Sequence, residues 1–107
     1  MKIFISGRIS DMDNLNKEAF EKAEKLLREK GHQPINPHKI PDPNKEYTYA
    51  EYMKIDLRAL LDCEGIYMLN DWGKSKGSCI ETIVANIIDL KIYYEEDFDD
   101  RNDNIYR

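Results

Sequence analysis

The segment 70–81 carries the residues of this sequence that are best suited to bind an anion. It contains two glycines, two lysines (Lys74 and Lys76) and two serines (Ser75 and Ser78). A short apolar run precedes it and an apolar helical pattern follows it, so we expect a strand, a loop and a helix N-terminus. Such a junction presents free backbone N–H groups and the positive end of a helix dipole, which both favour anions.

Glu81 follows this loop, one turn into the expected helix, and a second acid, Asp56, lies in the middle of an expected helix over 48–61. Simple phosphate binding does not require a carboxylate, so Glu81 indicates chemistry on the bound molecule. A carboxylate can attack the anomeric carbon of a sugar while a second acid assists the leaving group. The alternatives are ion pairs, of Glu81 with Lys74 or Lys76, and of Asp56 with a nearby basic residue.

Three other kinds of chemistry fit the sequence less well. A serine or cysteine nucleophile needs a positioned base, but His32 and His38 lie beside the expected second strand, away from the main loop. A Walker-type loop needs a Lys-Ser/Thr pair directly before the helix, which the order Gly-Lys-Ser-Lys-Gly at 73–77 does not provide. A phospho-acceptor site needs clustered acids at strand ends, where Ser6 and Gly7 follow the first strand instead.

Length and composition limit the class of protein. A chain of 107 residues forms one domain with a single core. The formal net charge of −5 argues against a nucleic-acid polymer as partner but not against a single nucleotide. No apolar run is long enough to span a membrane, and the N-terminal segment predicts a strand rather than a signal peptide. Cys63 and Cys79 lie in apolar contexts typical of reduced thiols in a cytoplasmic protein, and no Cys/His spacing indicates a metal site.

Apolar strands alternate with amphipathic helices along the chain. The expected strands cover residues 2–6, 32–37, 65–69 and 91–94, and the expected helices run from an N-cap at Asp13 or Asn14 to about residue 30, over 48–61 and over 78–90. The apolar stripe of the third helix is Ile80, Ile83, Val84, Ile87 and Leu90. Residues 39–47 form a loop long enough to cover a site, and residues 95–107 form an acidic tail outside the domain 1–94.

This order predicts an α/β fold with a doubly wound parallel sheet of the Rossmann or flavodoxin type, with four to five strands and three main helices. In such sheets, ligands bind at the carboxyl ends of the strands where the strand order reverses. With the order 2-1-3-4, that crevice lies between the first and third strands. Gly7 and Arg8 then border it on one side and the loop 71–81 on the other.

Several short motifs along the chain resemble those of a known family. They are Ile3-Phe4-Ile5-Ser6-Gly7 at the start, Asn36-Pro37 after the second strand, Asp56-Leu57 and Leu60-Leu61 in the second helix, and Ser75-x-Gly77-x-x-x-Glu81 in the main loop. With these motifs, residues 2–94 resemble the nucleoside 2-deoxyribosyltransferase-like superfamily, which includes the 2'-deoxynucleoside 5'-phosphate N-hydrolases. The chain is most similar to a short branch of that superfamily without an assigned function.

The resemblance implies roles for individual residues. Glu81 matches the nucleophile that forms a covalent deoxyribosyl–enzyme intermediate, and Asp56 matches the acid that assists departure of the base and orients the sugar. Gly7 matches the glycine under the sugar. Ser75 matches the serine that binds the 5'-phosphate, where the free-nucleoside transferases carry an aspartate. An aspartate would repel a phosphate, so we expect a nucleotide rather than a nucleoside.

The further candidates for substrate binding are Ser6, Arg8, Trp72, Gly77 and Ser78. The hydrolases place their first-loop arginine two residues later than Arg8. Trp72 is better suited to be a wall or core residue than a platform for base stacking, although a stacked base would also fit it. Members of the superfamily assemble as dimers or larger, which implies at least a homodimer here.

We therefore predict an enzyme that cleaves or transfers the N-glycosidic bond of a (deoxy)nucleoside 5'-monophosphate through Glu81, without a metal or other cofactor. One alternative is a non-catalytic module that binds a nucleotide on the same loop. Another is a small interaction protein that has kept only the fold.

Overall fold

The protein is built around one parallel sheet. The computed structural model describes residues 1–97, and its four strands lie in the order β2-β1-β3-β4. The strands are β1 (Lys2–Ser6), β2 (Gln33–Ile35), β3 (Gly65–Met68) and β4 (Lys91–Tyr94), and every neighbouring pair is parallel. The expected doubly wound sheet and its strand order are confirmed. Most of the expected acidic tail, residues 98–107, lies outside the described residues.

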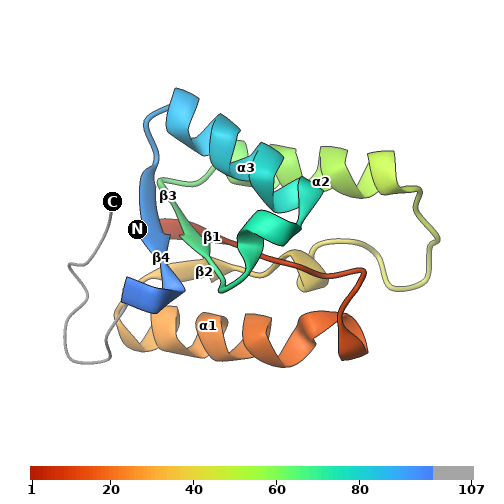
Figure 1. Ribbon diagram of the computed structural model, residues 1–107, viewed down its shortest axis with the longest axis horizontal. Helices are drawn as coiled ribbons and strands as arrows, with labels where there is room; N and C mark the ends of the chain where they lie inside the picture. Colours follow the sequence, from red (N-terminus) through yellow and green to blue (C-terminus); the bar gives the residue numbers. More distant parts are fainter. Residues whose placement is uncertain (98–107) are drawn as a thin grey trace.

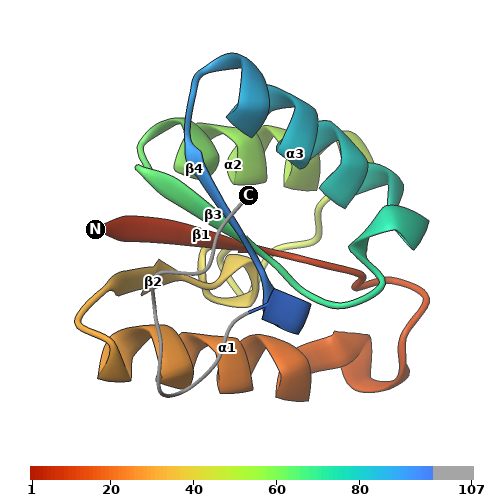
Figure 2. The ribbon, with the colours of Figure 1, turned by 60° about the vertical axis from the view of Figure 1, so that its left-hand side comes forward.

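Helices cover both faces of the sheet (Figure 1). Helix α1 (Lys17–Glu29) lies on one face, and α2 (Tyr49–Leu61) and α3 (Lys76–Ile87) lie on the other. Figure 2 shows the twisted sheet between these two layers. None of the helices in residues 1–97 is long and apolar enough to cross a membrane.

The core follows from the alternation of side chains along β1. Ile3 and Ile5 point to the side of α1 and pack in a cluster with Phe20 and Leu27. Phe4 points to the other side and joins a second buried cluster, to which the helices contribute Leu60 and Ala85. A central strand buried on both faces has to be apolar at every position, which explains the continuous apolar run.

The start of α1 differs from the prediction of an N-cap at Asp13 or Asn14. The helix begins at Lys17, and its N-cap Asn16 makes no side-chain capping bond. Asn14, Leu15 and Asn16 all have left-handed backbone angles, with φ of 51°, 54° and 59°. The Asn16 side-chain amide donates to the carbonyl oxygen of Arg8 at 2.9 Å, so this turn is tied to the loop after β1. Leu15 belongs to the apolar residues at helical spacing that predict the buried stripe of this helix, but it is 46% exposed.

The buried face of α3 also differs from the predicted apolar stripe. Ser78, Glu81 and Ala85 are its buried residues, whereas Ile83 and Ile87 are 57% and 74% exposed. The stripe was predicted from its apolar residues, because such residues normally mark the inward face of a helix. Here the inward face is polar where it meets the end of the sheet.

Candidate active site

A cavity of about 860 Å³ opens at the carboxyl ends of β1 and β3, at the position that the strand order predicts. The loops after β1 and β3, helix α2 and the chain after β2 all contribute to its wall. The sequence-predicted site residues along this cavity are Ser6, Gly7, Asp56, Ser75, Gly77, Ser78 and Glu81. The structure therefore brings together residues that are up to 75 positions apart in the chain.

Glu81 is hydrogen-bonded to Ser6, which in turn contacts Ser78. Its side chain is only 5% exposed, and its Oε1 accepts a hydrogen bond of 2.6 Å from the Ser6 hydroxyl. The Ser78 hydroxyl oxygen lies 2.9 Å from that of Ser6. In the structure the Ser6 hydroxyl bonds to Glu81 and the two serine hydroxyls contact one another. The substrate contacts that sequence reasoning predicted for both serines stay predictions.

The two acids of the cavity have raised pKa values. Burial raises the pKa of Glu81 to about 8; the hydrogen bond from Ser6 acts against this rise, and the nearby charge of Asp56 adds to it. Burial also raises the pKa of Asp56 to about 7. Two interacting carboxyls titrate as a pair, so the pair retains about one proton near neutral pH. One ionised and one protonated carboxyl in a cavity is the arrangement that nucleophile-plus-acid chemistry requires.

The N-terminus of α3 faces the same cavity. Ser75 is its N-cap, and the Ser75 hydroxyl accepts a hydrogen bond of 3.1 Å from the amide of Ser78. A Cβ at Gly77 would lie 3.2 Å from Met53 Sδ and 3.3 Å from Tyr49 Oη, so the glycine lets this turn approach α2 closely. Backbone amides in the first turn of a helix have no partner within it and favour anions.

Basic side chains from several elements line the cavity. They are Lys17 at the start of α1, Lys45 in the loop after β2, and Lys74 and Lys76 around the start of α3. The Lys74 ammonium also lies 4.0 Å from the Asp71 carboxylate. Lys74 and Lys76 place positive charge at the α3 N-terminus, and Lys17 and Lys45 add positive charge elsewhere along the cavity, although the chain is acidic overall.

Arg8 and Trp72 do not line the cavity. The Arg8 guanidinium pairs with the Asp11 carboxylate at 2.9 Å, and this hydrogen bond lowers the pKa of Asp11. Trp72 packs against the core on the α2–α3 side, with its ring centroid 6.1 Å from that of Tyr94. Substrate contacts by these two residues stay predictions.

Gly7 allows the loop after β1 to pass closely over Leu69. A Cβ at position 7 would lie 2.7 Å from Leu69 Cδ1 and 2.9 Å from Leu69 Cβ. We expect Gly7→Ala to lower the free energy of unfolding by about 1–3 kcal/mol, because Leu69 is buried and has little room to move. Urea unfolding measures this change.

The matched control is Gly73→Ala, since nothing lies within 4 Å of a Cβ there. It should change the free energy of unfolding by less than about 0.5 kcal/mol. Equal stability of the two variants would show that Leu69 accommodates the added methyl group.

His38 lines the cavity although sequence reasoning set it aside. It belongs to the 3-10 turn η2 (Pro37–Lys39), which follows β2. The His38 ring packs edge-on against Phe20, with ring centroids 4.8 Å apart, and burial lowers its pKa. The signal that was available is topological: β2 pairs with β1, so the chain leaving β2 opens onto the same end of the sheet.

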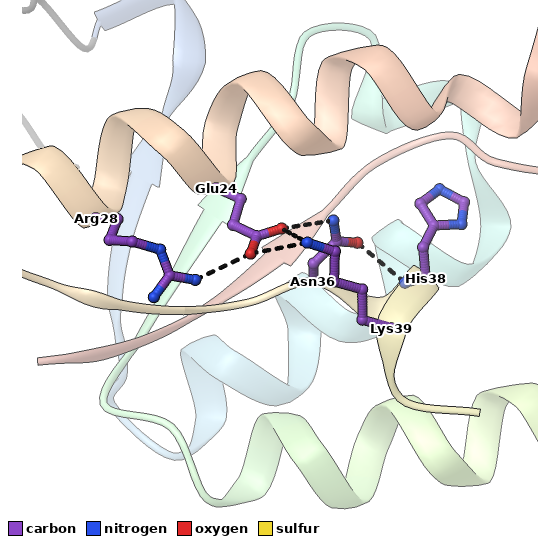
Figure 3. Close-up of polar contacts among 5 residues, drawn as sticks. All are labelled: Glu24, Arg28, Asn36, His38 and Lys39. Carbon is purple, nitrogen blue, oxygen red and sulfur yellow. Dashed lines mark hydrogen bonds and ion pairs between the residues drawn. The ribbon is translucent and has the colours of Figure 1, made fainter. Parts of the chain in front are cut away.

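A polar network attaches this turn to α1 (Figure 3). Asn36, 5% exposed, donates from its amide to Glu24 at 3.1 Å and accepts from the backbone amide of His38 at 3.0 Å. Arg28 and Lys39 each lie 2.9 Å from the Glu24 carboxylate. Burial would raise the pKa of Glu24, but hydrogen bonds from Lys39, Asn36 and Arg28 lower it. The network fixes the backbone that carries His38.

The tyrosines of α2 lie at the rim of the cavity rather than in the core. Tyr49 and Tyr52 line it and are 57% and 41% exposed. The loop expected to cover a site contributes Pro41 and Pro43 to the same wall. Among residues 1–97, no three His, Cys, Asp or Glu side chains come together as a metal site would require.

This sheet, with its cavity at the ends of β1 and β3, has the fold of the nucleoside 2-deoxyribosyltransferase-like proteins. A 2-deoxyribosyltransferase from the bacterium Bacillus psychrosaccharolyticus superposes with a TM-score of 0.71 and 20% identity, over 88% of this chain and 71% of that one. The CMP N-glycosidase BcmB of Clostridium botulinum superposes with a TM-score of 0.60 and 21% identity, over 88% and 67%.

The chain belongs to the family described as a domain of unknown function, DUF4406, which it matches over residues 1–94. No curated protein matches the sequence. At identities near 20%, the solved structures establish the fold, and the activity of this chain has to be argued from its own residues.

Proposed function

We propose that this protein cleaves the N-glycosidic bond of a (deoxy)nucleoside 5'-monophosphate, with Glu81 as nucleophile. The observation that carries the proposal is the pair of carboxyls with raised pKa values, Glu81 and Asp56, in one cavity with the N-terminus of α3. The structural likeness to an enzyme named as a 2-deoxyribosyltransferase and one named as a CMP N-glycosidase supports this class of reaction.

The reaction has two steps. In the first, the Glu81 carboxylate forms a bond to C1' of the sugar, the C1'–N bond breaks, and its electron pair stays with the base. The departing base takes the proton of Asp56, so it leaves as a neutral molecule. In the second step, water attacks C1', the Asp56 carboxylate accepts its proton, and Glu81 is released. Transfer would differ only in that a second base attacks C1'.

The phosphate would lie at the N-terminus of α3. Ser75 supplies a hydroxyl, the first turn supplies backbone amides, and Lys74 and Lys76 supply positive charge. This environment favours a phosphate over the uncharged 5'-hydroxyl of a nucleoside.

Release of free base is the test. The pure protein is incubated with each common ribo- and deoxyribonucleoside, with and without a 5'-phosphate, and the free base is followed by chromatography. We expect release from at least one 5'-monophosphate and slower release from the matching nucleoside. Absence of release from all of them, with a nucleotide still raising the melting temperature, would favour the non-catalytic binding module.

Ser75→Asp is expected to change the preference between nucleotide and nucleoside. Aspartate is as good an N-cap as serine, so the helix should stay intact, but its charge would repel the phosphate. We expect kcat/KM for the monophosphate to fall at least about tenfold relative to the nucleoside.

Ser75→Asn is the control for this substitution, because asparagine also caps a helix but carries no charge. An equal loss in the aspartate and asparagine variants would mean that the hydroxyl, and not the charge, determines the preference.

We also propose that the protein forms a homodimer through α2 and α3. Leu61, Ile83 and Ile87 on these helices are 57%, 57% and 74% exposed, and apolar side chains gathered in this way are typical of an interface. Ile87→Lys is expected to reduce the mass measured by sedimentation equilibrium to that of one chain. Glu18→Lys on the opposite layer should leave the mass unchanged, and a monomeric parent protein would contradict the proposal.

A further inference from the structure

Three buried side chains form a chain of hydrogen bonds that ends on the proposed nucleophile. Ser6 and Ser78 are 1% and 2% exposed, and Glu81 is 5% exposed. The Ser6 hydroxyl lies 2.9 Å from that of Ser78 and 2.6 Å from Glu81 Oε1. The three residues come from β1 and from two successive turns of α3, so two elements have to meet to build the chain.

The direction of the hydrogen bonds follows from the number of protons available. A serine hydroxyl has one proton and two acceptor positions. A separation of 2.6 Å between Ser6 Oγ and Glu81 Oε1 is typical of a hydroxyl that donates to an ionised oxygen. When Glu81 is ionised, Ser6 therefore donates its one proton to Glu81, and Ser78 donates to Ser6.

Asp56 has no equivalent support. Within residues 1–97, no hydrogen bond reaches its carboxyl group, and burial is the cause of its raised pKa. The two acids of the cavity thus differ in one respect that matters for charge: a donor points at Glu81 and none points at Asp56.

We propose that the Ser78–Ser6 chain shifts the negative charge of the carboxyl pair from Asp56 toward Glu81, and so populates the form in which Glu81 is ionised and Asp56 holds the proton. The two serines are then positioning residues, which assign the role of nucleophile to one acid and the role of proton donor to the other. The inference rests on the proposed function for its catalytic meaning, but the charge distribution itself exists without substrate.

The physical basis is a competition between two neighbouring acids. Burial disfavours the charged form of both, and their mutual repulsion opposes ionisation of the pair. A hydrogen bond donated to one carboxylate stabilises charge at that position only. The other ionisable side chains along the cavity are Asp11, Lys17, His38, Asp42, Lys45, Tyr49, Tyr52, Lys74 and Lys76. Asp56, on α2, is the charged group that raises the pKa of Glu81.

The test is a titration of the substrate-free protein by NMR with ¹³C-labelled carboxyl groups. Glu81→Gln and Asp56→Asn identify the two signals by their loss. In Ser6→Ala, we expect the pKa of Glu81 to rise by about one unit, a tenfold change in its proton affinity, and that of Asp56 to fall. Ser78→Ala should shift both in the same directions by less. Ser10→Ala, which removes an exposed hydroxyl from the loop after β1, should shift neither.

A rise in the pKa of Glu81 together with a fall in the pKa of Asp56 in Ser6→Ala supports the inference. Unchanged titrations in Ser6→Ala, or two pKa values that rise together, would overturn it, because general burial affects both acids alike. If Ser6→Ala does not fold, Ser78→Ala decides: a smaller shift of the same signs supports the inference, and no shift overturns it. None of these outcomes depends on base release, so a failure of the proposed activity would be seen separately.

The rate of base release provides a second measurement. Loss of the Ser6 hydroxyl should move the acidic limb of the pH–rate profile to higher pH by about one unit, since Glu81 would need more alkaline solution to ionise. KM should change little, because the Ser6 hydroxyl is already engaged with Glu81 and Ser78. A fall in rate at every pH without a shift of the limb would indicate a structural effect only.

Discussion

Replacement of Glu81 by glutamine is expected to lower the rate of base release by at least about a thousandfold. An amide oxygen is a poor nucleophile and cannot form the covalent bond to C1' that the reaction requires. Glutamine has the shape of glutamate, and its oxygen can still accept the hydrogen bond from Ser6. The fold should therefore persist, and the effect should fall on the chemical step.

The measurement is single-turnover base release at saturating nucleotide, beside a melting-temperature assay for binding. Glu29→Gln is the matched control, since this glutamate is exposed near the far end of α1. The control should keep the parental rate, and Glu81→Gln should keep the nucleotide-dependent rise in melting temperature. A Glu81→Gln protein that still releases base at the parental rate would place the nucleophile elsewhere.

The sequence predicts the layers of this fold well because the spacing of apolar residues changes clearly from one element to the next. β1 is continuously apolar, as a strand covered on both faces has to be, and α1 has an apolar stripe on a charged background. The strand order then brings Gly7 to the same edge as the loop before Glu81. The convergence of the loop after β1 with the loop before Glu81 follows from topology, whereas the place of Asp56 beside them was implied by the family resemblance and not by the strand order.

The details that sequence reasoning missed depend on contacts between distant segments. The left-handed turn before α1 is tied to the carbonyl of Arg8 by Asn16, and no local pattern reveals that bond. Ile83 and Ile87 are exposed because the inward face of α3 carries Ser78 and Glu81 instead of apolar residues. The bond of Ser6 to Glu81 and its contact with Ser78 could not be foreseen, because a serine after a strand is equally suited to bind a ligand.

Glu81→Gln is also expected to change how the stability of the protein depends on pH. The pKa of Glu81 is about 8 in the folded state against an ordinary value of 4.5, so folding takes up a proton between these two values. The unfolded chain then binds fewer protons than the folded one, and the free energy of unfolding falls as pH rises. The contribution of Glu81 is fully present below about pH 4.5 and is lost as pH rises through 8.

The expected size of this loss is about 5 kcal/mol, because each unit of pKa difference is worth about 1.4 kcal/mol. Asp56 acts in the same direction between its ordinary value of 3.8 and about 7. Glutamine does not titrate and carries no charge that repels Asp56, so the variant should lose much less stability over this range. At pH 8, it should be more stable than the parent protein.

Urea unfolding at pH 5, 6.5 and 8 measures the difference between parent and variant. The free energy of unfolding of Glu81→Gln should increase relative to that of the parent from each pH to the next. Glu29→Gln should show the same pH dependence as the parent. Parallel curves for parent and Glu81→Gln would mean that the carboxylate is ionised in the folded protein at low cost. A site that keeps a carboxyl group buried is less stable at the pH where that group is charged. The difference in free energy of unfolding between the parent and Glu81→Gln measures this cost for one residue.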